Sequence, residues 1–99
     1  MDRQPDLEVS GEVVHWRGPA PFHFLVIDGE AAGFLTEIRA QVTYGWGMVP
    51  VAGLIGSTRF TTSLWPRGEA YYLPLKEAVR AAEDVELGDR VSVRLWVTG

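Results

Sequence analysis

Apolar and polar residues alternate with a period of two in several short segments, and this alternation limits how the chain folds. Leu7–Trp16 opens with Leu, Val, Gly and Val alternating with Glu and Ser, and Arg90–Val97 alternates apolar residues with Arg and Ser. Such alternation is typical of strands that bury one face. Further strands are predicted between turn residues, over 22–27, 49–55, 58–64 and 70–73.

Two short helices are predicted among these strands. The first covers Ala31–Val42, where an apolar face is expected from Phe34, Leu35, Ile38 and Val42. The second covers Pro74–Glu83, with Pro74 in the first turn, where its missing N–H costs nothing. Trp65–Gly68 is expected to be a loop because it contains both a proline and a glycine.

The order strand, helix, strand occurs twice. Residues 22–27, 31–42 and 49–55 form the first unit, and residues 71–73, 74–83 and 91–97 form the second. The helices are too short for a doubly wound sheet. The repeat therefore predicts a mainly β barrel with pseudo-twofold internal symmetry and two short helices.

Length and charge set further limits. With 99 residues the chain has room for one domain, expected over residues 7–99 behind a frayed tail at 1–6. The net charge of −4 argues against nucleic acid as a partner, because an acidic protein must gather its few cations on one face to bind a polyanion. No leader peptide and no apolar run of about 20 residues is visible, so no membrane association and a cytoplasmic location are expected.

Several motifs along the chain resemble the DUF1905 family of small bacterial domains of unknown function. They are Ile38-Arg39, Gly45–Val51, Gly56–Pro66, Tyr72–Lys76, Val79-Arg80 and Val85–Val93. The resemblance covers roughly residues 7–97. It implies a double-split β-barrel, related in fold to the swapped-hairpin transcription factors of the AbrB type. No activity is attached to the family, so the resemblance implies a fold and no function.

Residues that carry catalytic chemistry are few. The two histidines, His15 and His23, have no carboxylate at a metal-ligand spacing, and the chain has no cysteine, so no metal and no cofactor are predicted. Ser63 and Lys76 are a conceivable nucleophile and base, yet nothing in the sequence brings them together. The glycine-containing segments lack the pattern of a phosphate-binding loop.

Aromatic residues are numerous for so short a chain, and several lie beside turns or cations. Most are expected to pack in the core or at its rim. The cations are expected to form a solvated surface, and a phosphate-contacting patch is the alternative; they are Arg59, Arg67, Lys76 and Arg80. The sharper hypothesis is a binding site around the predicted loops, made of Trp46, Arg59, Ser63, Trp65, Tyr72 and Lys76.

The favoured function is therefore a non-enzymatic binding module, a monomer or weak homodimer, for a small ligand or a protein partner. The alternative is a DNA-binding regulator, by analogy with the AbrB-type barrel. A small hydrolase is the third and least favoured hypothesis.

Overall fold

A computed structural model gives the fold and describes residues 3–16, 22–42 and 47–98. Its elements are β1 (Leu7–Trp16), β2 (Phe22–Ile27), α1 (Gly29–Val42), β3 (Val49–Ile55), β4 (Thr58–Arg67), β5 (Ala70–Pro74), α2 (Glu77–Glu83) and β6 (Arg90–Val97). All strand pairs are antiparallel, and the strands close into a barrel in the order β1-β2-β5-β4-β3-β6. The predicted fold class, a mainly β barrel with two helices, is confirmed.

The barrel consists of two halves with the same pairing pattern. Exchanging β1 with β4, β2 with β5 and β3 with β6 reproduces the strand order of the barrel. The registers agree as well, because Val14 lies opposite Phe24 in one half and Trp65 lies opposite Tyr72 in the other. A helix follows the second strand of each half. The internal duplication predicted from the sequence is therefore present in the strand pairing.

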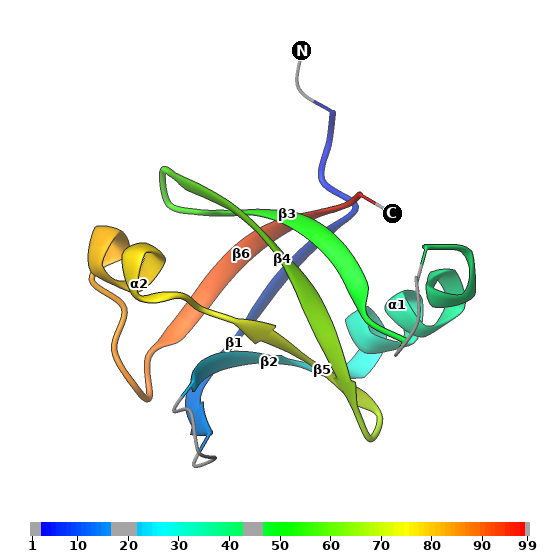
Figure 1. The fold of residues 1–99 in the computed structure, drawn as a ribbon, viewed down its shortest axis with the longest axis horizontal. Coiled ribbons are helices and arrows are strands. Elements are labelled where there is room, and N and C mark those ends of the chain that lie inside the picture. The colour runs from blue at the N-terminus through cyan, green and yellow to red at the C-terminus, as the bar shows by residue number, and fades with distance from the viewer. Residues whose placement is uncertain (1–2, 17–21, 43–46, 99) are drawn as a thin grey trace.

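The two helices lie on opposite sides of the barrel, and β4 crosses its front between them (Figure 1). Ala32 and Leu35 of α1 and Val79 of α2 belong to the same buried cluster as the inward residues of the strands. Burying a large aliphatic side chain contributes about 1.5–3 kcal/mol, so this shared core ties both helices to the barrel.

β4 is longer than predicted, and the expected loop at Trp65–Gly68 was wrong. The strand continues through Trp65, Pro66 and Arg67, which pair with β5, and Gly68 begins the turn with a φ of 61°. Pro66 is tolerated because the pairing of β4 with β3 ends at Leu64, so only one edge of the strand needs hydrogen bonds at that point.

The second helix begins later than predicted, because sheet pairing extends past Pro74. Pro74 is the last residue of β5 and lies opposite Phe24, and the backbone N–H of Leu75 donates to the carbonyl oxygen of His23 over 2.8 Å. The chain thus stays extended to Lys76, the N-cap residue, and α2 starts at Glu77.

The first helix begins two residues earlier than predicted, at Gly29, and its apolar face differs. Leu35 is buried, but Phe34, expected in the core, is 37% exposed. Adjacent helical residues project about 100° apart, so Phe34 turns away when Ala32 and Leu35 face the barrel.

Gly53 of β3 allows an aromatic ring to enter the barrel. A Cβ at this position would collide with the ring of Phe60 on β4, which lies opposite in the register. Phe60 packs against the buried cluster from this position.

Residues before β1 continue the contacts of the barrel. The backbone N–H of Asp6 donates to the carbonyl oxygen of Leu95, and the Asp6 carboxylate accepts from the N–H of Val97 over 2.7 Å. The indole N–H of Trp96 donates to the carbonyl oxygen of Arg3 over 2.7 Å. These bonds fix residues 3–6 beside the end of β6.

Candidate functional site

The outward side chains of β4 form the surface on which the predicted binding residues gather. Leu64 is buried inside the barrel, and residues of opposite parity point outward, as their exposure pattern shows. They are Arg59, Thr61, Ser63, Trp65 and Arg67. Together with the outward neighbours Tyr72 on β5, Ala52 on β3 and Trp96 on β6, these residues are called the β4 face.

Three aromatic side chains meet at one end of the β4 face. Trp65 lies directly opposite Tyr72, and the ring of Phe24 on β2 lies 5.3 Å from each of their rings. Phe24 is only 1% exposed, yet it stands outside the interior cluster of the barrel. It packs against the aromatic rings of the outer surface, and Trp65 remains 39% exposed.

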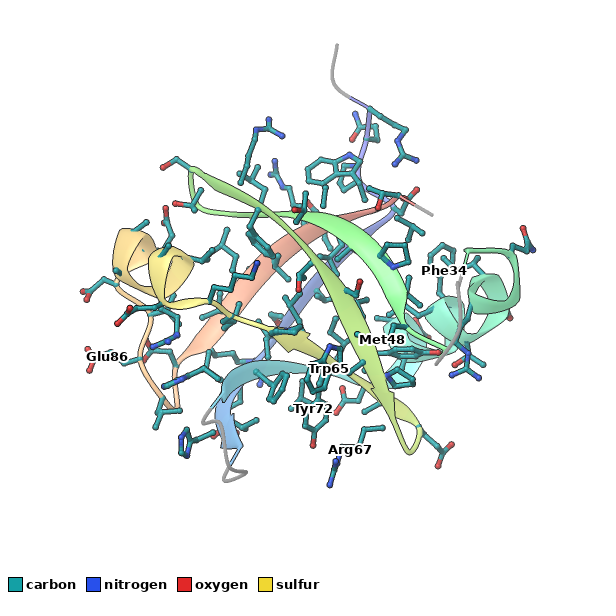
Figure 2. The ribbon with its side chains drawn as sticks, in the orientation of Figure 1. Phe34, Met48, Trp65, Arg67, Tyr72 and Glu86 are labelled. Carbon is teal, nitrogen blue, oxygen red and sulfur yellow. The ribbon has the colours of Figure 1, made fainter. Side chains whose placement is uncertain are left out.

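A cation completes this aromatic end. The guanidinium carbon of Arg67 lies 5.9 Å from the centre of the Tyr72 ring, within the range of a cation–π contact. A small hollow of about 60 Å³ is lined by Phe24, Trp65, Pro66, Arg67 and Tyr72. Figure 2 shows Trp65, Tyr72 and Arg67 at the same end of β4.

A second hollow lies at the other end of the β4 face. It has a volume of about 540 Å³, and its lining includes the small residues Ala52 and Gly53. Its other lining residues are Arg3, Arg59, Phe60, Thr61 and Trp96. The guanidinium of Arg3 pairs with Asp6 at 3.2 Å, whereas Arg59 makes no ion pair with any residue in the described ranges.

The structure brings four of the six predicted site residues to this one surface. Arg59, Ser63 and Trp65 point outward from β4, with Ser63 opposite Pro50, and Tyr72 is the neighbour of Trp65. Lys76 is exposed at the N-cap of α2 and lines neither hollow. Trp46 lies outside the described residues.

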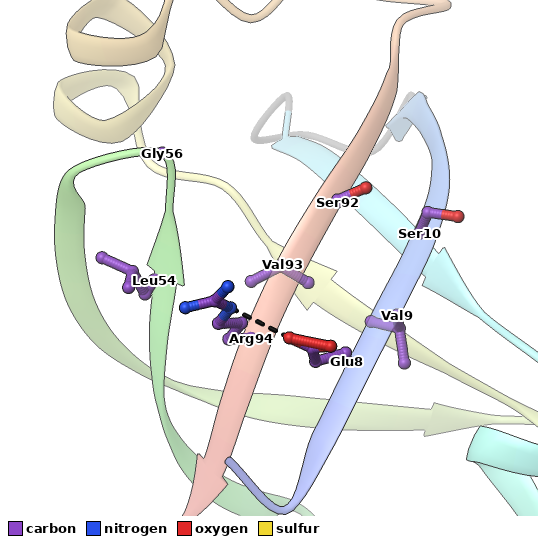
Figure 3. A pocket seen from close by; sticks show the side chains of 8 residues that line it. All are labelled: Glu8, Val9, Ser10, Leu54, Gly56, Ser92, Val93 and Arg94. Atoms are coloured by element: carbon purple, nitrogen blue, oxygen red, sulfur yellow. Dashed lines mark ion pairs between the residues drawn. The ribbon is translucent and has the colours of Figure 1, made fainter. Parts of the chain in front are cut away.

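A third hollow, of about 480 Å³, follows the outside of β1 and β6 (Figure 3). Within it Arg94 Nε lies 3.0 Å from a carboxylate oxygen of Glu8, and both side chains are about 60% exposed. Because each charge neutralises the other, this hollow offers a ligand little net charge. It is less suited to binding than the β4 face.

His15 and His23 lie opposite each other on β1 and β2, with ring centres 5.5 Å apart and ring planes inclined at 66°. Nδ1 of His23 is buried and has no hydrogen-bond partner within the described chain. Burial, with the nearby charges of Arg80 and His15, lowers the pKa of His23 below its ordinary 6.5. The ring is therefore neutral at pH 7.

These positions give little support to hydrolysis. Ser63 is on β4 and His23 on β2, with β5 between the two strands. A general base needs a positioned partner, which Nδ1 of His23 does not find in the part of the chain that the structure describes. Over the same residues, no three His, Asp or Glu side chains gather as metal ligands.

Phe24, Arg67 and Trp96 lie at this surface but were not among the six predicted site residues, and Arg67 was considered only as one of the surface cations. Phe24 was predicted only as part of a strand, and its parity opposite to that of buried Leu25 indicates the outer surface once the inward residue is known. Arg67 and Trp96 could be assigned only from the barrel closure, which brings β5, β4, β3 and β6 side by side.

The fold and the surface together define the chain as a closed six-stranded barrel with a cation-bearing aromatic face and two helices packed at its sides. The model of the family described as "Domain of unknown function (DUF1905)" matches residues 10–95. The chain therefore belongs to the DUF1905 family. No curated protein matches it. Neither described helix is long and apolar enough to cross a membrane.

Proposed function

We propose that this chain is a non-enzymatic binding module whose ligand lies on the β4 face. A barrel of antiparallel strands gives this face a rigid backbone, and the two helices leave it uncovered (Figure 1). Rigid placement of aromatic and polar side chains is what a recognition surface requires, because less freedom is lost on binding.

The burial of Phe24 on the outside of the barrel is the observation that carries the proposal. Exposed aromatic residues scattered singly are ordinary on protein surfaces. Here Trp65 and Tyr72 instead pack against a third ring that is only 1% exposed, and an open hollow lies beside the three rings. A contiguous aromatic surface edged by a guanidinium can hold a planar or apolar group and orient it through a polar one.

Ligand-observed NMR tests the proposal directly. A library of small aromatic and heteroaromatic compounds and short peptides would be screened against the native protein, Trp65→Ala and Tyr72→Ala. We expect hits with the native protein that are lost in both variants. Thermal unfolding of each variant should remain cooperative, because the side chains lie outside the interior core.

Phe34→Ala is the matched control. Phe34 has nearly the exposure of Trp65, 37% against 39%, but stands on α1 away from the β4 face. Hits should survive this change. Hits that persist in Trp65→Ala, or a Trp65→Ala protein that no longer folds, would contradict a binding role for this residue.

The proposal extends to the type of barrel, the location, the oligomeric state and the partner. The symmetric strand pairing supports a barrel of the double-split type. We further expect the module to act in the cytoplasm as a monomer or weak homodimer. Its partner is a small ligand or a segment of a larger molecule.

A further inference from the structure

The charges of this acidic protein are segregated by strand. The chain has thirteen Asp and Glu against nine Lys and Arg, but none of the acids occurs in 22–27, 49–55, 58–67, 70–74 or 90–97. These ranges are β2 to β6, and the four arginines among them lie on β4 and β6, on either side of β3. Acidic residues return on β1, where Glu8 and Glu12 lie opposite Arg94 and Arg90.

Each end of the β4 face pairs a guanidinium with aromatic rings. Arg67 stands over Tyr72 beside Trp65, and Arg59 shares a hollow with Trp96. The two arginines are eight positions apart along the extended strand, which corresponds to about 26 Å at ~3.3 Å per residue. The hydroxyl residues Thr61 and Ser63 occupy the outward positions between them.

From this arrangement we propose that the ligand of the β4 face is single-stranded nucleic acid, its bases stacked on Trp65, Tyr72 and Trp96 and its phosphates contacted by Arg59 and Arg67. The inference rests on the function proposed above. Aromatic rings spaced along a basic track are how proteins bind single strands without sequence preference. In a duplex the bases already stack on one another, so exposed rings add little.

Two acids flank the track without lying on it. Glu69 is in the turn after Arg67 and lines a separate hollow with Asp28 and Arg39, and Glu83 of α2 accepts a hydrogen bond from Thr58. The acids reduce the attraction at the two ends. They restrict binding to a short strand on the β4 face, with weak affinity and strong dependence on salt.

A proline-rich peptide is the competing occupant, because such peptides dock in aromatic grooves. It would use Trp65 and Tyr72 and leave Arg59 without a role. Nucleic acid is favoured because the strands of the β4 face carry no acids and because Arg59 lies with Trp96 at the second hollow.

Fluorescence polarisation tests the proposal. The probes are 5′-fluorescein-labelled dT12 and rU12, a 12-bp duplex and a ten-residue polyproline peptide, titrated at 20 and 150 mM NaCl. We expect both single strands to bind with a dissociation constant of about 10⁻⁴ to 10⁻⁶ M at physiological salt, and the duplex to bind more weakly. The expected slope of log K against log salt is about −1.4 for two phosphate contacts.

Two variants locate the binding. Trp65→Ala should weaken dT12 binding by about 5- to 100-fold, the loss expected for one stacked base. Arg59→Gln, at an exposed position, should weaken it severalfold at 20 mM NaCl and reduce the salt slope by about 0.7. Arg90→Gln removes the same charge from the first residue of β6, opposite Glu12, and should change dT12 affinity by less than about twofold.

Three results would overturn the proposal: no binding of either single strand at 20 mM NaCl, equal losses in Arg59→Gln and Arg90→Gln, or binding of the polyproline peptide in place of the oligonucleotides. If the oligonucleotides fail while library compounds still bind in a Trp65-dependent way, the binding module stands and only the nucleic-acid inference falls. A preference of dT12 over rU12, or the reverse, identifies the natural strand.

Discussion

β1 and β4 occupy equivalent places in the two halves of the barrel, and they resemble each other on the inward face but not on the outward face. The inward positions are alike: buried Val13 of β1 corresponds to buried Leu64 of β4. The outward positions are not, because Glu8 corresponds to Arg59 and Val14 to Trp65. The same strand therefore presents an acidic, apolar surface in one half and a basic, aromatic surface in the other.

This difference separates what the fold requires from what a ligand requires. The inward residues are similar because both strands pack into one core. The outward residues are free of that constraint, so their charge can differ between the two halves, and a ligand can use the positive charge and the aromatic rings of β4.

Leu64→Ala should lower the free energy of unfolding by about 2–5 kcal/mol, because Leu64 is fully buried and its removal leaves a cavity. Val13→Ala, the equivalent change in β1, should cost about 2 kcal/mol, and Trp65→Ala, one residue along β4, clearly less than Leu64→Ala. Urea denaturation gives all three values. If Trp65→Ala is as costly as Leu64→Ala, the β4 face is structural.

Tyr71→Phe should cost about 0.5–1.5 kcal/mol, the usual worth of a hydrogen bond. The Tyr71 hydroxyl lies 3.0 Å from Oγ1 of Thr36 and joins β5 to α1. The Thr36 hydroxyl also donates to the carbonyl oxygen of Ala32, so it keeps a partner in the variant. Thermal unfolding of Tyr71→Phe, Thr36→Val and the double variant would show whether the two residues act together. If the stability losses of the two single variants add up to the loss in the double variant, they do not.

His23 occupies on β2 the place that Tyr71 occupies on β5, but its buried Nδ1 has no partner among the described residues. Its pKa is lowered by burial and then by Arg80 and His15, so the unfolded chain binds a proton more readily than the folded one. Its contribution to stability is complete above pH 6.5 and is lost as pH falls from 6.5 toward the lowered pKa.

Urea denaturation between pH 4.5 and 7.5 measures this loss. His23→Phe should flatten the part of the profile just below pH 6.5, whereas His15→Phe, at an exposed position, should change it less. If the unfolding free energy of His23→Phe depends on pH as steeply as that of the native protein, other groups cause the pH dependence.

Glu8→Gln should change stability by less than about 0.5 kcal/mol, because the exposed pair with Arg94 is screened by solvent. It releases Arg94, which lies across β3 from Arg59, with Leu54 between them in the register. We expect dT12 binding to tighten by about twofold at 20 mM NaCl. Weaker dT12 binding in Glu8→Gln would contradict the inference that positive charge on β4 and β6 attracts the strand.

The strands were largely predictable, and the errors have a common cause. Alternation is a local property, so β1, β3 and β6 were predicted with the bounds that the structure has. Pro66 was predicted to lie in a loop and Pro74 in the first turn of a helix, but each belongs to a strand at a point where only one edge of that strand is paired. Which edge is paired depends on barrel closure, which no short segment specifies.

The candidate site was predictable only in part, for a similar reason. Trp65 and Tyr72 attract notice as aromatics beside a turn, and the register then makes them neighbours. Phe24 and Trp96 come from strands far away in the sequence, and only the strand order brings them to the same surface. The segregation of acids becomes meaningful once β3 to β6 are known to be adjacent.

Chemical-shift mapping with dT12 tests the central claim, that the β4 half and not the β1 half binds. We expect the backbone amide chemical shifts of residues 58–67 and 70–74 to change most on titration, and those of residues 7–14 to stay unchanged. Equal changes on the two strands, or changes confined to β1, would contradict it.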